Sequence, residues 1–208
     1  MQQKNSEPPG HTSRAGVPPP AAAAHSPLAP LVSKLPRVGT TIFSVMSALA
    51  AEHDAVNLGQ GFPDFDCDPR LVDAVDEAMR KGFNQYPLMA GVPSLRQAIA
   101  NKIGYLYGGH YDPEHEITVT AGATQAILTA VLCCVHPGDE VIVIEPIYDS
   151  YLPAIALAGG KPVPVQMTLG DEGYAIPWDA VAAAITPKTR LLILNSPNNP
   201  TGTVLGED

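Results

Sequence analysis

The chain has 208 residues, of which 45% are hydrophobic and 16% are charged, a composition typical of globular rather than disordered proteins. Its formal net charge is -9 and no cluster of lysines or arginines interrupts the acidic balance, so we expect neither a nucleic-acid surface nor a surface for anionic membranes. No run of about 18 apolar residues occurs that would cross a membrane, and three cysteines, two of them adjacent, indicate a reducing cytoplasmic compartment rather than a disulfide framework.

The first segment, residues 1–34, is rich in proline and alanine. It lacks the apolar core of a signal peptide and the arginine-rich pattern of a transit peptide. Such a composition offers too little apolar surface to form a packed core. We therefore predict a disordered leader over 1–34.

Helical patterns follow the leader. Apolar residues recur at helical spacing from residue 42 to about His53, which predicts a first helix. Thr40 or Thr41, just before it, is suited to cap this helix. A short strand-like piece over 55–64 then ends in a glycine-rich loop. Asp68, followed by a proline, has the residue types of an N-cap and a first helical position, and it opens a second helix. A third helix is predicted from about 94 to 107.

From residue 117 onward the pattern changes to alternating strands and helices. Repeated β-α-β units predict an α/β fold, with a largely parallel sheet flanked by helices on both faces. Because the last predicted strand leaves an apolar sheet edge uncovered, we expect further sequence beyond residue 208. The predicted strands span 117–120, 140–145, 162–166 and 190–195, and the predicted helices span 122–135, 150–157 and 178–185.

The segment 118–126 contains the first candidate site. Here a predicted strand runs into Gly122, and the small residues around it, including Ala123, allow backbone N–H groups to approach a ligand. The helix that starts there directs its positive end at the same place, which favours an anion, and Thr124 adds a hydroxyl donor. A tight turn without a ligand explains this motif equally well.

The second candidate is Tyr148, which stands just beyond the end of the predicted strand 140–145. Ligands in parallel sheets bind outside the C-terminal ends of the strands. A flat tyrosine ring at that place can stack on a planar heterocycle. A tyrosine that fills the rim of the core is an equally good explanation.

The third candidate follows the last predicted strand. Residues 199–202, Asn-Pro-Thr-Gly, fit a type I turn, which accounts for Pro200 and Gly202. It accounts for Asn199 only in part, because aspartate or serine would serve the turn as well. The Asn199 amide could donate a hydrogen bond to a phenolate oxygen. An anion site, a stacking ring and a donor to a phenolate together describe pyridoxal 5'-phosphate (PLP).

These motifs resemble those of the class I/II (fold type I) PLP-dependent aminotransferases, in the branch of the methionine, kynurenine and glutamine–phenylpyruvate enzymes. The resemblance runs from about residue 35 to the last residue, in the order of the family. It implies the PLP-dependent transferase fold, with 35–70 as a small-domain segment and 71–208 as the first part of a PLP-binding large domain. The segments that carry it are 57–65, 84–86, 118–124, 148–151 and 198–202.

The resemblance also implies roles for individual residues. The turn of Gly122, Ala123 and Thr124 would bind the PLP phosphate, Tyr148 would stack on the pyridine ring, and Asn199 would bond the ring oxygen. Many relatives have an aromatic residue at the position of Thr124. The threonine here matches the methionine-type members instead.

Two further residues complete the implied site. Gly61 would lie in the loop that closes over the substrate carboxylate, and Tyr86 would complete the site of a partner subunit in a homodimer. No metal site is expected, because the His, Asp and Glu residues of the chain lack the convergent spacing that a metal requires.

The implied activity is transfer of an amino group from an amino acid of methionine, glutamine or aromatic type to a 2-oxo acid. In the family, the Schiff-base lysine, the acidic partner of the pyridinium and the carboxylate-binding arginine all follow the turn at 199–202. None of the six lysines here occupies that position, so we expect the catalytic residues beyond Asp208 and an inactive chain without them. A PLP-dependent carbon–sulfur β-lyase and a non-catalytic, truncated binding protein remain alternatives.

Overall fold

The computed structural model describes residues 31–206, apart from 37, 62, 64 and 172. The predicted leader over 1–34 therefore lies almost entirely outside the described residues. The described residues from Lys34 onward belong to one structural unit. Within the described part of the chain, no helix combines the length and apolar character needed to cross a membrane.

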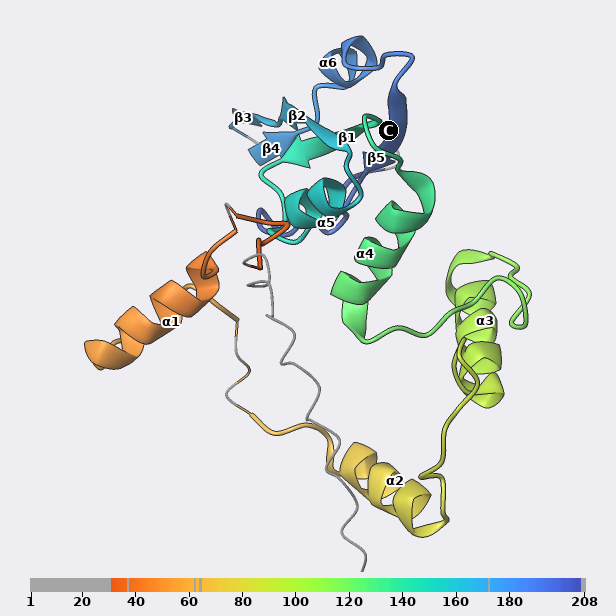
Figure 1. The fold of residues 1–208 in the computed structure, drawn as a ribbon. Helices are drawn as coiled ribbons and strands as arrows, with labels where there is room; N and C mark the ends of the chain where they lie inside the picture. Colours follow the sequence, from red (N-terminus) through yellow and green to blue (C-terminus); the bar gives the residue numbers. More distant parts are fainter. Residues whose placement is uncertain (1–30, 37, 62, 64, 172, 207–208) are drawn as a thin grey trace, which may run out of the picture. The chain divides into compact units, whose positions relative to one another are not determined.

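The three helices predicted before the sheet are present (Figure 1). The cap of the first is Thr41, whose Oγ1 accepts the N–H of Ser44 at 3.3 Å. The cap of the second is Asp68, whose carboxylate accepts the N–H of Arg70 at 2.9 Å. The third ends at Gly108, which adopts a left-handed φ of +67° that favours glycine. These helices are α1 (Ile42–Glu52), α2 (Pro69–Arg80) and α3 (Pro93–Tyr107).

A three-stranded parallel sheet with the order β2-β1-β5 follows in the chain. Its central strand is almost fully buried, as its β-branched sequence predicts. Helices alternate with the strands along the chain, which confirms the predicted α/β class. The strands are β1 (Glu140–Glu145), β2 (Lys161–Gln166) and β5 (Thr189–Ile193), and the helices are α4 (Gly122–Cys134), α5 (Tyr151–Leu157) and α6 (Trp178–Ala183).

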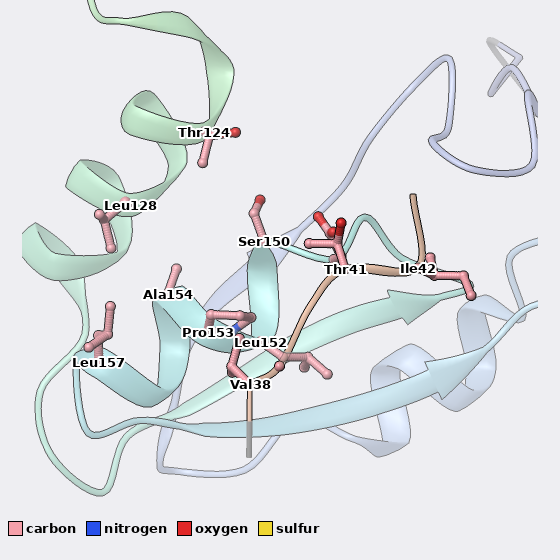
Figure 2. A pocket seen from close by; sticks show the side chains of 12 residues that line it. Val38, Thr41, Ile42, Thr124, Leu128, Ser150, Leu152, Pro153, Ala154 and Leu157 are labelled. Atoms are coloured by element: carbon pink, nitrogen blue, oxygen red, sulfur yellow. The ribbon is translucent and has the colours of Figure 1, made fainter. Parts of the chain in front are cut away.

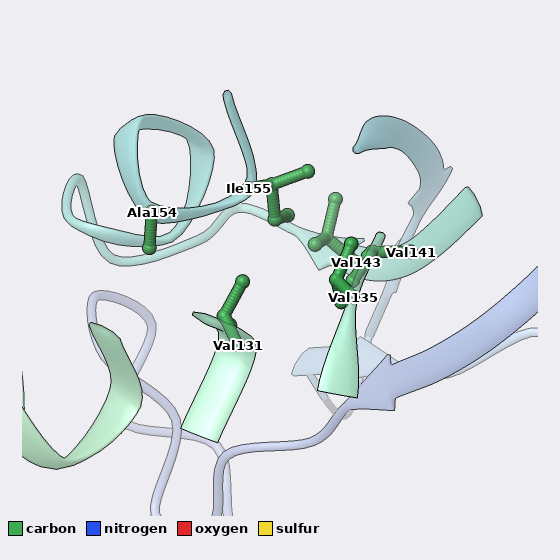
Figure 3. Close-up of a cluster of buried hydrophobic side chains, with 6 residues drawn as sticks. All are labelled: Val131, Val135, Val141, Val143, Ala154 and Ile155. Atoms are coloured by element: carbon green, nitrogen blue, oxygen red, sulfur yellow. The ribbon is translucent and has the colours of Figure 1, made fainter. Parts of the chain in front are cut away.

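The two faces of β1 bury two different hydrophobic clusters. Val141 and Val143 pack with Val131 of α4 and Ile155 of α5 (Figure 3). The alternate residues of β1 pack with Val181 of α6 and with β2 on the other face. This alternation follows from the period of two in a strand. The helices therefore cover the sheet on both faces, and β1 is the element against which the rest of the sheet is built.

Three features differ from the sequence prediction. The segment 117–120 is not a strand, because within the described part of the chain a single backbone hydrogen bond joins it to a distant segment, from the Val119 N–H to the Ala90 carbonyl at 2.9 Å. The described residues of 55–64 likewise form no strand. The hairpin of β3 (Thr168–Gly170) and β4 (Gly173–Ala175) was not predicted, because three-residue strands carry too little periodicity to detect.

Candidate functional site

Tyr148 and Asn199 line one pocket of about 400 Å³. Tyr148 follows β1 and Asn199 follows β5, and these neighbouring strands run parallel, so their C-terminal ends lie at the same edge of the sheet. Gly61, from the loop after α1, lines the same pocket. The structure thus brings together three of the residues singled out from the sequence. Phe43, Gly59, Gln60 and Pro200 complete the lining.

The Tyr148 wall is held by Tyr151. The two rings are 6.0 Å apart between centroids and lie at 73° to each other, an edge-on contact. The Tyr151 N–H donates to the Tyr148 carbonyl at 3.3 Å. Tyr151 is buried, and this burial, with a smaller contribution from Tyr148, raises the pKa of its phenol. Tyr148 is therefore held by both a backbone and an aromatic contact.

The Asn199 wall is a turn that differs from the predicted one. A type I turn over 199–202 would direct the Gly202 N–H to the Asn199 carbonyl, but this N–H donates to the Asn198 carbonyl at 2.8 Å. The reversal therefore spans 198–202, and Gly202 has a φ of +75° that favours glycine. Buried Asn198 locks it, because its Oδ1 accepts both the N–H and the hydroxyl of Thr201, at 3.2 and 2.8 Å.

The side chain of Asn199 itself is exposed and bonds to no described residue. Its position is set through the backbone, because its N–H donates to Oδ1 of Asn195 at 2.8 Å. The fold thus orients this residue while leaving its amide free to donate to a ligand. Asn195 was not singled out from the sequence, and only its place at the end of the last predicted strand could have indicated it.

The loop that contributes Gly61 to the pocket is attached to α1 through the side chain of Asn57. The Asn57 Nδ2 donates to Ser47 Oγ at 3.0 Å, and the Asn57 Oδ1 accepts the N–H of Gly59 at 3.0 Å. A Cβ built at Gly61 would meet no atom within 4 Å. Space inside the fold therefore does not require glycine at position 61, and a requirement from a ligand would explain it. The bond from the Gly59 N–H to the Asn57 side chain is a common asparagine turn, and the spacing of Asn57 and Gly59 could have indicated it from the sequence.

The turn of Gly122, Ala123 and Thr124 begins α4, as expected. Gly122 has a φ of +80°, and Ala121 before it caps the helix with no side-chain bond. The N–H groups of Ala123 and Thr124 donate to no described residue. All three residues are exposed. Free N–H groups at the positive end of a 13-residue helix are suited to an anion.

Thr124 lines a second pocket, of about 550 Å³, rather than the one with Tyr148. Figure 2 shows Thr124 and Leu128 of α4 on one side of this pocket, and α5 with Ser150 before it on the other. The Ser150 hydroxyl is buried and bonds to no described residue. The walls of the two pockets are continuous in sequence, since Tyr148 lines one and the two residues after it line the other. Gly122 and Ala123 line neither.

Tyr86 lines neither of these two pockets and is fully exposed. An exposed tyrosine is available to a neighbouring subunit, and its assignment to a partner's site stays a prediction. No lysine lines either pocket. In the described part of the chain, no group of three or more His, Cys, Asp or Glu side chains is arranged to hold a metal ion.

Comparison with known proteins places these features in context. Residues 53–208 match the family model "Aminotransferase class I and II". The chain is 52% identical over 174 residues to a probable N-succinyldiaminopimelate aminotransferase of Mycobacterium tuberculosis, covering 84% of this chain and 44% of that protein. It is 50% identical over 180 residues to the methionine aminotransferase of Escherichia coli, covering 86% of this chain and 46% of that protein.

Solved structures agree with these matches. The N-succinyldiaminopimelate aminotransferase of M. tuberculosis superposes with a TM-score of 0.81 at 51% identity, over 85% of this chain and 46% of that one. The E. coli protein YbdL, described as having a methionine aminotransferase function, gives a TM-score of 0.80 at 48% identity, over 86% and 47%. The chain therefore spans about half the length of the relatives it matches.

Proposed function

The chain belongs to the class I and II aminotransferase family, and from this premise we propose that it supplies the PLP-binding part of an enzyme that transfers an amino group from an amino acid to a 2-oxo acid. The observation that supports this most directly is the pocket at the sheet edge that Tyr148, Asn199 and Gly61 line together. The proposed donors are amino acids of methionine, glutamine or aromatic type.

The residues present suit PLP, the cofactor of the family. The free N–H groups of Ala123 and Thr124, with the positive end of α4, would bind the phosphate. The ring of Tyr148 would lie against the pyridine ring, and the unpaired Asn199 amide would donate to the ring oxygen. When bound, PLP supplies an electron sink for the bond changes at the substrate α-carbon.

The chain would contribute to substrate binding as well. The loop that Asn57 fastens to α1 brings Gly61 to the pocket, where the lack of a side chain leaves room for a carboxylate. Tyr86 would complete the site of a second subunit in a homodimer. In the domain arrangement that we propose, residues 35–70 belong to the small domain and residues 71–208 to the large one.

The proton-transferring lysine would come from outside this chain. No lysine lines the pocket of Tyr148, and the chain spans under half of each relative. Without that lysine, PLP would be held only by the phosphate contacts, the stacking ring and Asn199. We therefore propose that residues 1–208 alone bind PLP weakly and do not transaminate.

Binding and turnover should be measured on the 208-residue chain. Saturable PLP binding is expected, and Tyr148→Leu should weaken it by about fivefold or more, since stacking of a planar base on an aromatic ring is worth about 1–3 kcal/mol. Tyr105→Leu is the matched control, because Tyr105 is exposed and lines neither of the two pockets of the site. Oxo-acid formation should be absent.

Two results would contradict the proposal. Equal PLP affinity in wild type, Tyr148→Leu and Asn199→Ala would remove these residues from the site. Turnover by the 208-residue chain, after host enzymes have been removed, would refute the need for a lysine from elsewhere. A chain that carries the region corresponding to the second half of the relatives should use methionine, glutamine or aromatic donors.

A further inference from the structure

The ring of Tyr148 has an aromatic neighbour that the proposed function does not use. Tyr148 stands in the turn between β1 and α5, where the backbone is not held by a strand or a helix. Its hydroxyl makes no hydrogen bond with the described residues, and its one aromatic contact among them is with Tyr151. A ring at the wall of a pocket needs such a contact to keep one orientation.

Tyr151 is suited to provide it. It is the first residue of α5 and only 8% exposed, so its own ring is held by the surrounding protein. One turn further along α5, Ala154 and Ile155 pack in the core with Val131 and β1. The position of Tyr151 is therefore set by the core of the domain and not by the pocket.

The geometry of the pair leaves Tyr148 available to a ligand. Aromatic rings attract each other in an edge-to-face arrangement with centroids about 4.5–7 Å apart, and these two lie 6.0 Å apart at 73°. At this angle Tyr151 covers at most one face of the Tyr148 ring. The hydrogen bond from the Tyr151 N–H to the Tyr148 carbonyl fixes the spacing of the two residues.

We propose that Tyr151 is a positioning residue: its buried ring holds the Tyr148 ring in the orientation that stacks on the pyridine ring of PLP. This inference rests on the proposed function, because it assigns Tyr151 a role that acts through Tyr148. Positioning the Tyr148 ring requires the aromatic ring of Tyr151 but not its phenol hydroxyl.

The test is a double-mutant cycle on the 208-residue chain, read out as PLP affinity. Tyr151→Phe keeps the ring and should bind within about twofold of wild type, whereas Tyr151→Leu should bind about two- to tenfold more weakly, the range measured for edge-to-face pairs. In a chain that already carries Tyr148→Leu, adding Tyr151→Leu should cause no further loss. Tyr151→Met replaces Tyr151→Leu if that variant unfolds.

The outcomes separate the inference from the proposed function. Wild-type affinity in Tyr151→Leu, beside weakened binding in Tyr148→Leu, would overturn the inference alone. An equal loss from Tyr151→Leu with and without Tyr148 would also overturn it, because it would show a general structural role. Absence of PLP binding by wild type, or no effect of Tyr148→Leu, would refute the proposed function instead.

Discussion

Replacing Gly91 by alanine should destabilise the chain, and the structure gives two separate reasons. Gly91 has a φ of +105°, which residues with a side chain adopt only at a cost. An added Cβ would lie 2.7 Å from Cγ2 and 2.8 Å from Cβ of Val119. Val119 is itself tied to this loop, because its N–H donates to the Ala90 carbonyl at 2.9 Å. The contact matters for the candidate site, since Val119 leads into the turn at Gly122.

The magnitude follows from adding the two costs. A left-handed φ costs about 1–2 kcal/mol for a residue with a Cβ, and overpacking costs about 1–3 kcal/mol. Alanine restricts the unfolded chain, which returns about 0.4–1 kcal/mol. The net loss in the free energy of unfolding should be about 2–4 kcal/mol, and each kcal/mol lowers the Tm by about 2–4 °C in a domain of this size.

The assay is urea unfolding followed by circular dichroism, with Gly82→Ala as the control. Gly82 has a φ of +85°, but a Cβ there would meet no atom within 4 Å. Gly82→Ala therefore has the unfavourable backbone conformation without the close contact, and its free energy of unfolding should fall by only about 1 kcal/mol. If Gly91→Ala and Gly82→Ala lose the same free energy of unfolding, Val119 moves aside freely and the reasoning from the close contact is wrong.

Two further predictions concern local hydrogen bonds. The bond from His115 to the Asp112 carboxylate, at 2.7 Å, raises the pKa of His115 above 6.5 and lowers the pKa of Asp112 below 3.8. The stability that it contributes is lost as pH rises through the raised histidine value and as pH falls through the lowered aspartate value, so it is greatest between pH 3.8 and 6.5. An NMR titration should find this shift, and Asp112→Asn should bring the His115 pKa back toward 6.5; no change in that variant would contradict the assignment. Asn198→Ala should cost about 1–3 kcal/mol of unfolding free energy, because it removes the acceptor of the Thr201 N–H and one of the two acceptors of the Thr201 hydroxyl. Asn199→Ala should leave stability unchanged, and equal unfolding midpoints for the two variants would show that Asn198 does not lock the turn.

Local signals were sufficient for most of the helices and for the central strand. Thr41 and Asp68 begin the first two helices as their side-chain chemistry predicts, because a cap acts within its own turn. The prediction of a strand over 117–120 was wrong, because a strand depends on a partner as well as on its own residues. The four β-branched residues of this segment suit a strand, but a strand exists only where a neighbour completes the ladder of hydrogen bonds, and Val119 makes a single bond to Ala90.

In the candidate site, too, some features are local and others depend on the tertiary structure. The sequence by itself determined which residue types could serve PLP, namely the small-residue turn at Gly122, the ring of Tyr148 and the amide of Asn199, because their chemistry is a local property. The places of Tyr148 and Asn199 after strands were also readable from local patterns. The tertiary structure decided that Tyr148, Asn199 and Gly61 share one pocket and that Thr124 lines the next one. It also supplied the residues that hold them, such as Tyr151 and Asn57. The parallel pairing of β1 with β5 brings the residues that follow these strands to one edge of the sheet, and it arises from packing between segments far apart in the chain, which no short sequence window contains.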